Sequence, residues 1–413
     1  MRDRRKLRWL LVLIPIIALA LVIVWQDAMK PPPLAPVWEA NLGDCRMRDM
    51  RITPDGETML VLRTGDSCRL SAYAKNGIEI WTWESEQIDR LRSIEFHDDR
   101  IYLYGYGDLV SLTSNGMEIW SCSIDYEDPP PPVQGIGTEA DFLVAIYSTL
   151  YGFSDDGSIV WTLPGQECYG WRTETSSGLW VGSAGFEAIA HHADGTVAWG
   201  PTGQVIECAE FIAYPDGSVC RMSNWEFVEC GNSVLGLEWH ETDGTSRFHV
   251  PRFSVFNMDV APDGGIYYQD IIIIPSTGRK VFNACKLFPD NSRRVVHSGE
   301  SCPHEVRYLA DGTLAFLHQN YFTGEFDEFL CDIGIGYDLH RRFNIPTGES
   351  EHRCSVMMYH DNGAVQVYPL ARPIKENTHH WLVFGDLLVM IDEDRSSRQD
   401  TWLIAYRIPE EEK

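Results

Sequence analysis

A short pattern that ends in Trp recurs at nearly constant spacing through the first half of the chain. It combines an alternating strand, a two-residue turn that ends in Gly, and a second short strand, as in LSAYAKNGIEIW at 70–81. The pattern returns at 109–120, 150–161 and 188–199, so the Trp residues recur about every 40 residues. Such a repeat indicates an array of similar supersecondary units, each of which contacts its neighbours.

A second turn marks each unit. It occurs eight times, at 53–57, 97–100, 138–141, 175–178, 214–218, 261–265, 309–313 and 360–364. Many of these turns contain Asp-Gly or Asn-Gly, which supply the positive φ that tight hairpins need. Two hairpins make four antiparallel strands per unit, and four-stranded units of this length are typical of propeller blades. We therefore predict an all-β fold, an eight-bladed β-propeller, with seven blades as the alternative count.

The two ends of the chain supply complementary strands. Residues 402–408 (WLIAYRI) resemble the third strand of a blade, whereas 36–42 (PVWEANL) resemble the fourth, with Trp38 in the expected place. We predict that this N-terminal strand completes the last blade and removes its open edge. Residues 344–401 are longer than one blade needs, which indicates an insertion near 370–380 or a ninth irregular hairpin.

The repeat resembles the propeller repeats of the pyrroloquinoline-quinone, or quinoprotein-like, family. That family includes quinoprotein dehydrogenases and the propeller lipoprotein that assists outer-membrane protein assembly. The resemblance covers 38–199 well and 200–408 loosely, and it implies an eight-bladed shape in which the Trp residues pack between blades. The adjacent-Cys disulfide, cofactor-stacking Trp and calcium ligands of the dehydrogenases have no counterpart here, nor has the lipid-attachment Cys. The resemblance therefore implies no cofactor and no site.

The N-terminus predicts a membrane anchor. Basic residues in 1–8, a cytoplasmic segment, precede an apolar run at 9–25 that would span about 25 Å as a helix. Such a signal anchor keeps its N-terminus cytoplasmic and exports the rest, to the periplasm or cell surface. A Pro-rich linker at 26–36 then leads to the propeller at 37–413. A cleaved signal peptide is the alternative, but no small-x-small site follows the run.

The charge of the chain restricts its partners. A formal net charge of −26 repels nucleic acid, so we expect none to bind. A basic protein or a cation is favoured instead. Acidic residues recur in the loops that lead into first strands and would gather on one face, or they form only a solvated rim: Glu84, Glu86, Glu167, Glu300, Glu349 and Glu351.

Eleven Cys in an exported chain indicate disulfides, and the odd number leaves at least one thiol outside them. The Cys positions fall near the starts of first and third strands. The sequence does not determine the connectivity, and the candidate bridges are Cys45–Cys68, Cys285–Cys302, Cys331–Cys354, and Cys208 with Cys220 or Cys230.

No catalytic constellation stands out in the sequence. There is no GxSxG, HExxH or Walker motif, and DEDRSSRQD at 392–400 lacks the Gly of a calcium loop. The adjacent His191 and His192 read as satisfied or solvated side chains. We therefore expect a non-enzymatic protein-interaction or scaffold module without a cofactor or metal, with envelope assembly as its candidate process. The alternative is a quinoprotein-like enzyme or ligand-binding propeller with its site in an axial pocket.

Overall fold

The described part of the chain forms eight separate four-stranded antiparallel sheets, which confirms the predicted all-β class. This fold is known from a computed structural model. The structure describes residues 33–88, 90–124, 138–146, 149–164, 170–184, 187–202, 209–223, 236–251, 253–254, 264–274, 279–288, 290–299, 306–309, 313–320, 353–359, 365–371, 381–392 and 400–409. These residues form strands, turns and bends, with no helix among them.

The sheets are numbered here in chain order. Sheet 1 contains β2 (Arg46–Ile52), β3 (Met59–Thr64), β4 (Cys68–Tyr73) and β5 (Glu79–Ser85). Sheet 2 contains β6 (Ser93–His97), β7 (Arg100–Gly105), β8 (Asp108–Thr113) and β9 (Glu118–Ser123). Sheet 3 contains β10 (Phe142–Ile146), β11 (Thr149–Phe153), β12 (Ile159–Pro164) and β13 (Gly170–Trp171). Sheet 4 contains β14 (Thr173–Glu174), β15 (Trp180–Ala184), β16 (Glu187–His191) and β17 (Val197–Thr202).

The second half follows the same plan. Sheet 5 contains β18 (Ala209–Ala213), β19 (Val219–Ser223), β20 (Gly236–His240) and β21 (Ser246–Pro251). Sheet 6 contains β22 (Phe253–Ser254), β23 (Ile266–Ile274), β24 (Arg279–Leu287) and β25 (Arg293–Gly299). Sheet 7 contains β26 (Val306–Tyr308), β27 (Leu314–Asn320), β28 (Arg353–Tyr359) and β29 (Val365–Pro369). Sheet 8 contains β30 (Trp381–Phe384), β31 (Leu387–Asp392), β32 (Thr401–Arg407) and β1 (Pro36–Gly43).

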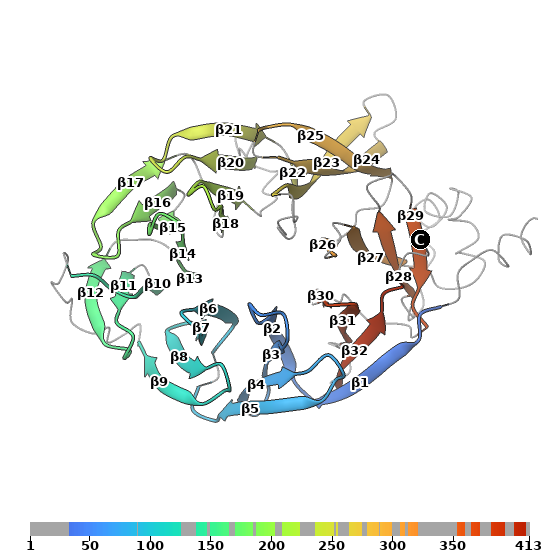
Figure 1. Ribbon diagram of the computed structural model, residues 1–413, viewed down its shortest axis with the longest axis horizontal. Helices are drawn as coiled ribbons and strands as arrows, with labels where there is room; N and C mark the ends of the chain where they lie inside the picture. The colour runs from blue at the N-terminus through green and yellow to red at the C-terminus, as the bar shows by residue number, and fades with distance from the viewer. Residues whose placement is uncertain are drawn as a thin grey trace, which may run out of the picture.

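The sheets follow one another around a common centre in a propeller-like arrangement. Figure 1 shows strands such as β2, β6 and β18 nearest the centre, and β1, β5 and β21 along the outer rim. The core lies between neighbouring sheets. One buried cluster, for example, joins Met59 of sheet 1 to Phe384 and Leu403 of sheet 8. Strand β3 is buried along its whole length because neighbouring sheets cover both of its faces.

The pairing of the two chain ends is confirmed. β1 runs antiparallel to β32, with Glu39 opposite Ile404 and Ala40 opposite Leu403. Ahead of β1, Leu34 forms a bridge to Leu370, next to the end of β29. The described part of the chain contains no helix of the length and apolarity that a bilayer crossing requires. The predicted anchor at 9–25 lies outside the described residues.

One predicted hairpin is wrong, and another joins a different pair of strands from the pair expected. The stretch 138–141 does not join the first two strands of sheet 3, because β13, which follows β12 in the chain, pairs with the inner edge of β10. The stretch 360–364 connects β28 to β29, the third and fourth strands of sheet 7. The first turn of sheet 8 is instead Gly385–Asp386. The insertion predicted near 370–380 lies mostly outside the described residues.

Candidate interaction face

A Trp side chain in the outer strand of one sheet donates a hydrogen bond to a turn of the next sheet. Trp38, in β1 of sheet 8, donates from Nε1 to the carbonyl of Lys75 in sheet 1 at 2.9 Å. Trp120 in sheet 2 donates to Asp155 in sheet 3 at 2.9 Å, and Trp161 in sheet 3 donates to Ala193 in sheet 4 at 3.1 Å. Each indole also lies against the Gly that ends the turn. The repeated Trp is therefore an inter-sheet joint, as the sequence predicted.

Steric contact explains why that turn residue must be Gly. Gly157 has a φ of +83°, a region that L side chains rarely adopt. A Cβ at Gly157 would lie 2.5 Å from Cδ2 of Trp120. The joint thus sets both the backbone conformation of the turn and its position relative to the preceding sheet.

An Asp side chain closes many of these turns. In the turn between β11 and β12, Asp156 accepts hydrogen bonds from the Ser154 hydroxyl at 2.6 Å and from the Ser158 backbone N–H at 3.0 Å. Equivalent bonds close the turns of other sheets, through Asp55, Asp194, Asp216, Asp243 and Asp290. Such local bonds preorganise the turn.

The same bonds favour the charged form of these carboxyl groups. The pKa of Asp156 is lowered to about 2, first by the Ser154 hydroxyl and then by the Ser158 N–H. Hydrogen bonds from Thr or Ser likewise lower the pKa values of Asp55, Asp194, Asp216, Asp243 and Asp290. These side chains are exposed, or partly so at Asp194. They therefore present negative charge to solvent across the neutral and mildly acidic range.

These turns gather on one face of the molecule. In an antiparallel four-stranded sheet, the turn between strands one and two lies at the same end as the turn between strands three and four. An ion pair of 3.2 Å between Lys75 Nζ and Glu57 Oε1 joins the two turns of sheet 1. Arg100 at the first turn of sheet 2 pairs with Asp155 of sheet 3 at 3.2 Å. We call this surface the turn face.

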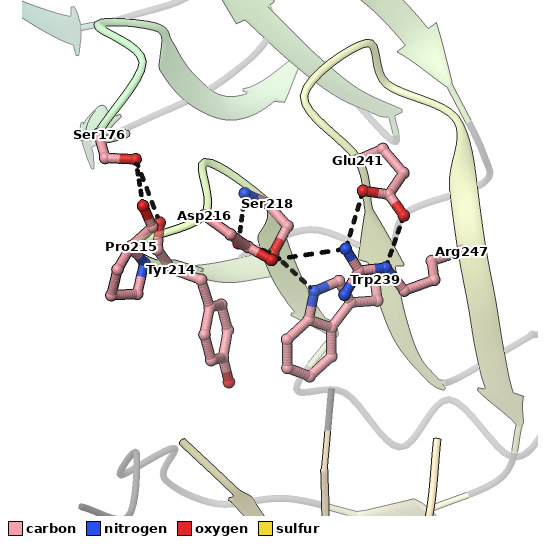
Figure 2. A network of polar contacts seen from close by, with 8 residues as sticks. All are labelled: Ser176, Tyr214, Pro215, Asp216, Ser218, Trp239, Glu241 and Arg247. Carbon is pink, nitrogen blue, oxygen red and sulfur yellow. Dashed lines mark hydrogen bonds and ion pairs between the residues drawn. The ribbon is translucent and has the colours of Figure 1, made fainter. Parts of the chain in front are cut away.

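Sheet 5 carries the most connected part of the turn face. Figure 2 shows the Arg247 guanidinium between two carboxylates, with bonds of 2.6 and 2.8 Å to Glu241 and an ion pair of 3.5 Å to Asp216. Asp216 also accepts from Ser218, whose hydroxyl accepts from Trp239 Nε1 at 2.9 Å. Across the sheet boundary, Ser176 of sheet 4 donates to the carbonyls of Tyr214 and Pro215. This network locks the first turn of sheet 5 to sheet 4.

Other turn carboxylates have no such cation. Within the described ranges, no Lys, Arg or His lies within ion-pair distance of Asp55, Asp156, Asp194, Asp243 or Asp290. Sequence reasoning read these Asp residues as turn formers only. The recurrence of exposed Asp in hairpins of one register was the signal that could have identified an acidic face.

Two of the acidic residues predicted to form a ring, Glu84 and Glu86, are described and follow β5 at the end of sheet 1 opposite the turn face. Glu84, at the end of β5, is exposed and accepts a hydrogen bond from Ser67, and Glu86 is also exposed. Glu167, Glu300, Glu349 and Glu351 lie outside the described residues. Their gathering into a ring therefore stays a prediction.

The predicted pair Cys45–Cys68 is wrong. No disulfide joins these two cysteines, which the structure describes. Arg46 pairs with Thr64, and Thr64 pairs with Cys68, so β3 lies between the two Cys positions. Two strand spacings put their Cα atoms roughly 10 Å apart, beyond the reach of a disulfide.

The other predicted disulfides have at least one partner that cannot be placed. Cys208, Cys230, Cys302 and Cys331 lie outside the described residues, whereas Cys220, Cys285 and Cys354 lie in β19, β24 and β28. Cys122 of β9 is a free thiol, and burial, followed by the charge of Asp108, raises its pKa to about 12.

One histidine differs from expectation, and another was not singled out from the sequence. His192 is exposed, as predicted, but His191 is fully buried at the end of β16, and neither of its ring nitrogens has a hydrogen-bond partner among the described residues. Sequence reasoning did not find His97, which joins sheet 2 to sheet 4. Its Nδ1 lies 3.7 Å from Glu174 Oε2, and its ring centroid lies 5.4 Å from that of Trp180.

Among the residues that the structure describes, no group of three or more His, Cys, Asp or Glu side chains has a geometry that could hold a metal ion. The loop at 393–399 that resembles part of a calcium site is not among them.

Comparisons with known proteins inform the fold alone. No protein-family model and no curated protein matches this chain, so the resemblance to the quinoprotein-like family stays a prediction. Among solved structures, the chain is similar to the computationally designed Ika8 protein, at 7% identity and a TM-score of 0.50. The match covers 92% of this chain and 100% of that one.

Proposed function

We propose that this chain is a closed eight-bladed β-propeller, held to a membrane by residues 9–25, that docks a basic protein on its turn face. It acts as a scaffold or interaction module on the extracytoplasmic side and carries out no reaction of its own. The blades supply a rigid support, and the exposed turns supply the contacts.

Several inter-sheet contacts support closure. Sheet 7 contacts sheet 8 through β26 and β30. Trp joints link sheet 8 to sheet 1, and sheets 1 to 5 in succession, through Trp38, Trp81, Trp120, Trp161 and Trp199. The position of sheet 6 between sheets 5 and 7 in Figure 1 is consistent with a complete ring. A closed ring leaves no sheet face open, which favours a long-lived platform.

One observation carries the proposed partner chemistry: a charged Asp closes turns of sheets 1, 3, 4, 5 and 6 on one face. Oriented carboxylates at repeated spacing attract a positively charged surface and accelerate its association. Local hydrogen bonds already hold them, so little side-chain entropy is lost on binding.

The test is co-purification of the full chain from its native membrane after crosslinking, with partners identified by mass spectrometry. Asp156→Asn and Asp194→Asn keep an oxygen that can close the turn but remove its charge. We expect the double variant to lose the partner and the wild type to release it as salt is raised. Glu84→Gln with Glu86→Gln, on the opposite side, is the matched control. Equal capture by both double variants would contradict docking at the turn face.

The enzyme alternative has its own readout. Elemental analysis and an absorption spectrum of the purified chain would reveal a retained metal or quinone. Either finding would replace the scaffold proposal with a cofactor-binding propeller.

A further inference from the structure

Three arginines meet at the inner ends of sheets 1 and 2, on the side opposite the turn face. Arg46 and Arg48 lie in β2, and Arg92 lies just before β6. β2 and β6 are the innermost strands of adjacent sheets and contact one another (Figure 1). The three side chains therefore come from two blades that meet near the central axis.

The backbone is irregular at the middle arginine. Met47 pairs with Arg63 and Asp49 pairs with Leu62, so Arg48 is the extra residue of a β-bulge. A bulge changes the direction of a side chain relative to the regular ladder and often adjoins a functional site. Arg48 is held there by a bond of 2.8 Å from its Nε to the Thr64 hydroxyl. Its remaining N–H groups have no acceptor among the residues that the structure describes.

Arg48 lies near two other arginines, whereas the neighbouring Asp49 carboxylate accepts from Ile94 N–H and Arg51. Its pKa is lowered, first by burial and then by the positive charges of Arg46 and Arg92. Only the Cys68 thiol and the Tyr106 hydroxyl act in the opposite direction among the main causes. Over the part of the chain that is described, no carboxylate lies within ion-pair distance of these three arginines. The adjoining loops carry Asp44 and Asp66, both exposed.

An uncompensated group of cations is unexpected in a chain of net charge −26. Surface arginines elsewhere in these two sheets have acidic partners, Arg69 with Glu79 and Arg100 with Asp155. Mutual repulsion of like charges costs stability unless a bound anion relieves it.

Tyr106 completes the surroundings. The Arg92 guanidinium lies 3.8 Å from the centroid of the Tyr106 ring, and that residue is 48% exposed. A guanidinium stacked on an aromatic face loses mobility but keeps its in-plane N–H groups available for an oxyanion. Two or more guanidinium forks that converge from different strands match the several oxygens of a phosphate.

We propose that Arg46, Arg48 and Arg92 form a binding site for a phosphate group, either free in solution or carried by a phospholipid head group. The site is distinct from the turn face, so it stands or falls independently of the proposed docking of a basic protein. Guanidinium N–H groups donate to the phosphate oxygens, and the bound charge removes the repulsion among the three side chains.

The test is calorimetric titration of the full chain with inorganic phosphate and with pyrophosphate, in a phosphate-free buffer of low ionic strength. We expect saturable binding in the millimolar range or tighter. Arg46→Gln and Arg92→Gln, both exposed, should each weaken it by about tenfold, since each removes charge-assisted bonds. Arg69→Gln in the same sheet is the control and should bind as the wild type does.

Flotation with vesicles of phosphatidylglycerol in phosphatidylcholine separates the two sources of phosphate. Vesicle binding that free phosphate displaces, and that Arg92→Gln abolishes, assigns the site to head groups. Titration without vesicle binding assigns it to a soluble ligand. No binding of either kind, or equal binding by wild type and both variants, overturns the proposal. A second measurement covers folding: phosphate should raise the urea midpoint of the wild type but not of Arg92→Gln.

Discussion

Acidification should lower the stability of the fold through protonation of one buried residue, His191. This side chain is fully buried at the end of β16, opposite Trp180, and in the part of the chain that the structure describes neither ring nitrogen has a hydrogen-bond partner. At the same place in their sheets, Tyr73 and Phe153 end the third strand of sheets 1 and 3. His191 therefore occupies a core position that other units fill with an aromatic ring.

The pKa of His191 sets the size of the effect. Burial first, and then the positive charges of Arg172 and His192, lower that pKa from 6.5 to about 4. Between these values the unfolded chain binds a proton that the folded protein excludes, so stability falls as the pH falls. The full shift corresponds to about 3 kcal/mol, of which about 2 kcal/mol is lost between pH 7 and pH 5. Above about pH 7.5 the residue contributes almost no pH dependence, because the imidazole is then neutral in both states.

The assay is urea unfolding followed by Trp fluorescence at pH 7 and pH 5. His191→Phe should remove most of the loss of unfolding free energy that the wild type shows between these values. It should also fold well at pH 7, because Phe fits a ring-sized site and brings no unpaired nitrogen. His192→Gln, at an exposed neighbour, should keep most of the wild-type dependence. If wild type and His191→Phe lose equal stability on acidification, burial of a neutral imidazole is not the cause.

Three further predictions concern the joints and a thiol. Gly157→Ala should destabilise by more than about 2 kcal/mol in urea unfolding, since its Cβ would collide with the indole of the preceding sheet. Gly56→Ala, at a similar φ of +73° but with open space around the Cβ, should cost only about 1 kcal/mol of backbone strain. Trp161→Phe should lower the free energy of unfolding by about 1 kcal/mol more than Trp199→Phe in the same assay, because of these two indoles only that of Trp161 donates a hydrogen bond. Equal losses would show that this hydrogen bond does not contribute to stability. Cys122 should resist iodoacetamide at pH 8 in the folded protein and react in urea, as read by mass spectrometry, because its raised pKa leaves little thiolate.

Local features of the sequence were sufficient to predict the four-stranded units and much of the order of their strands. Alternating strands and turns with Gly at positive φ are set by neighbouring residues, so the hairpins around Gly77 and Gly157 could be predicted directly. The pairing of β1 with β32 could also be predicted, because each end carries half of a recognisable blade. The acidic turn face was within reach too, since each Asp that closes a turn is also an exposed charge.

Other features depended on tertiary contacts. β13 follows the outer strand β12 in the chain but pairs with β10 at the inner edge of sheet 3. No local sequence pattern encodes which edge of a sheet a two-residue strand will join. The predicted disulfide between Cys45 and Cys68 was wrong because β3 lies between the strands that carry them, and proximity in the sequence does not show this. The proposed site at Arg46, Arg48 and Arg92 depends on a bulge in β2 and on the contact of β2 with β6, which bring together charges from two sheets. Periodicity and turn chemistry are local and can be read along the chain, whereas inter-strand register and inter-sheet packing are set by contacts between distant residues.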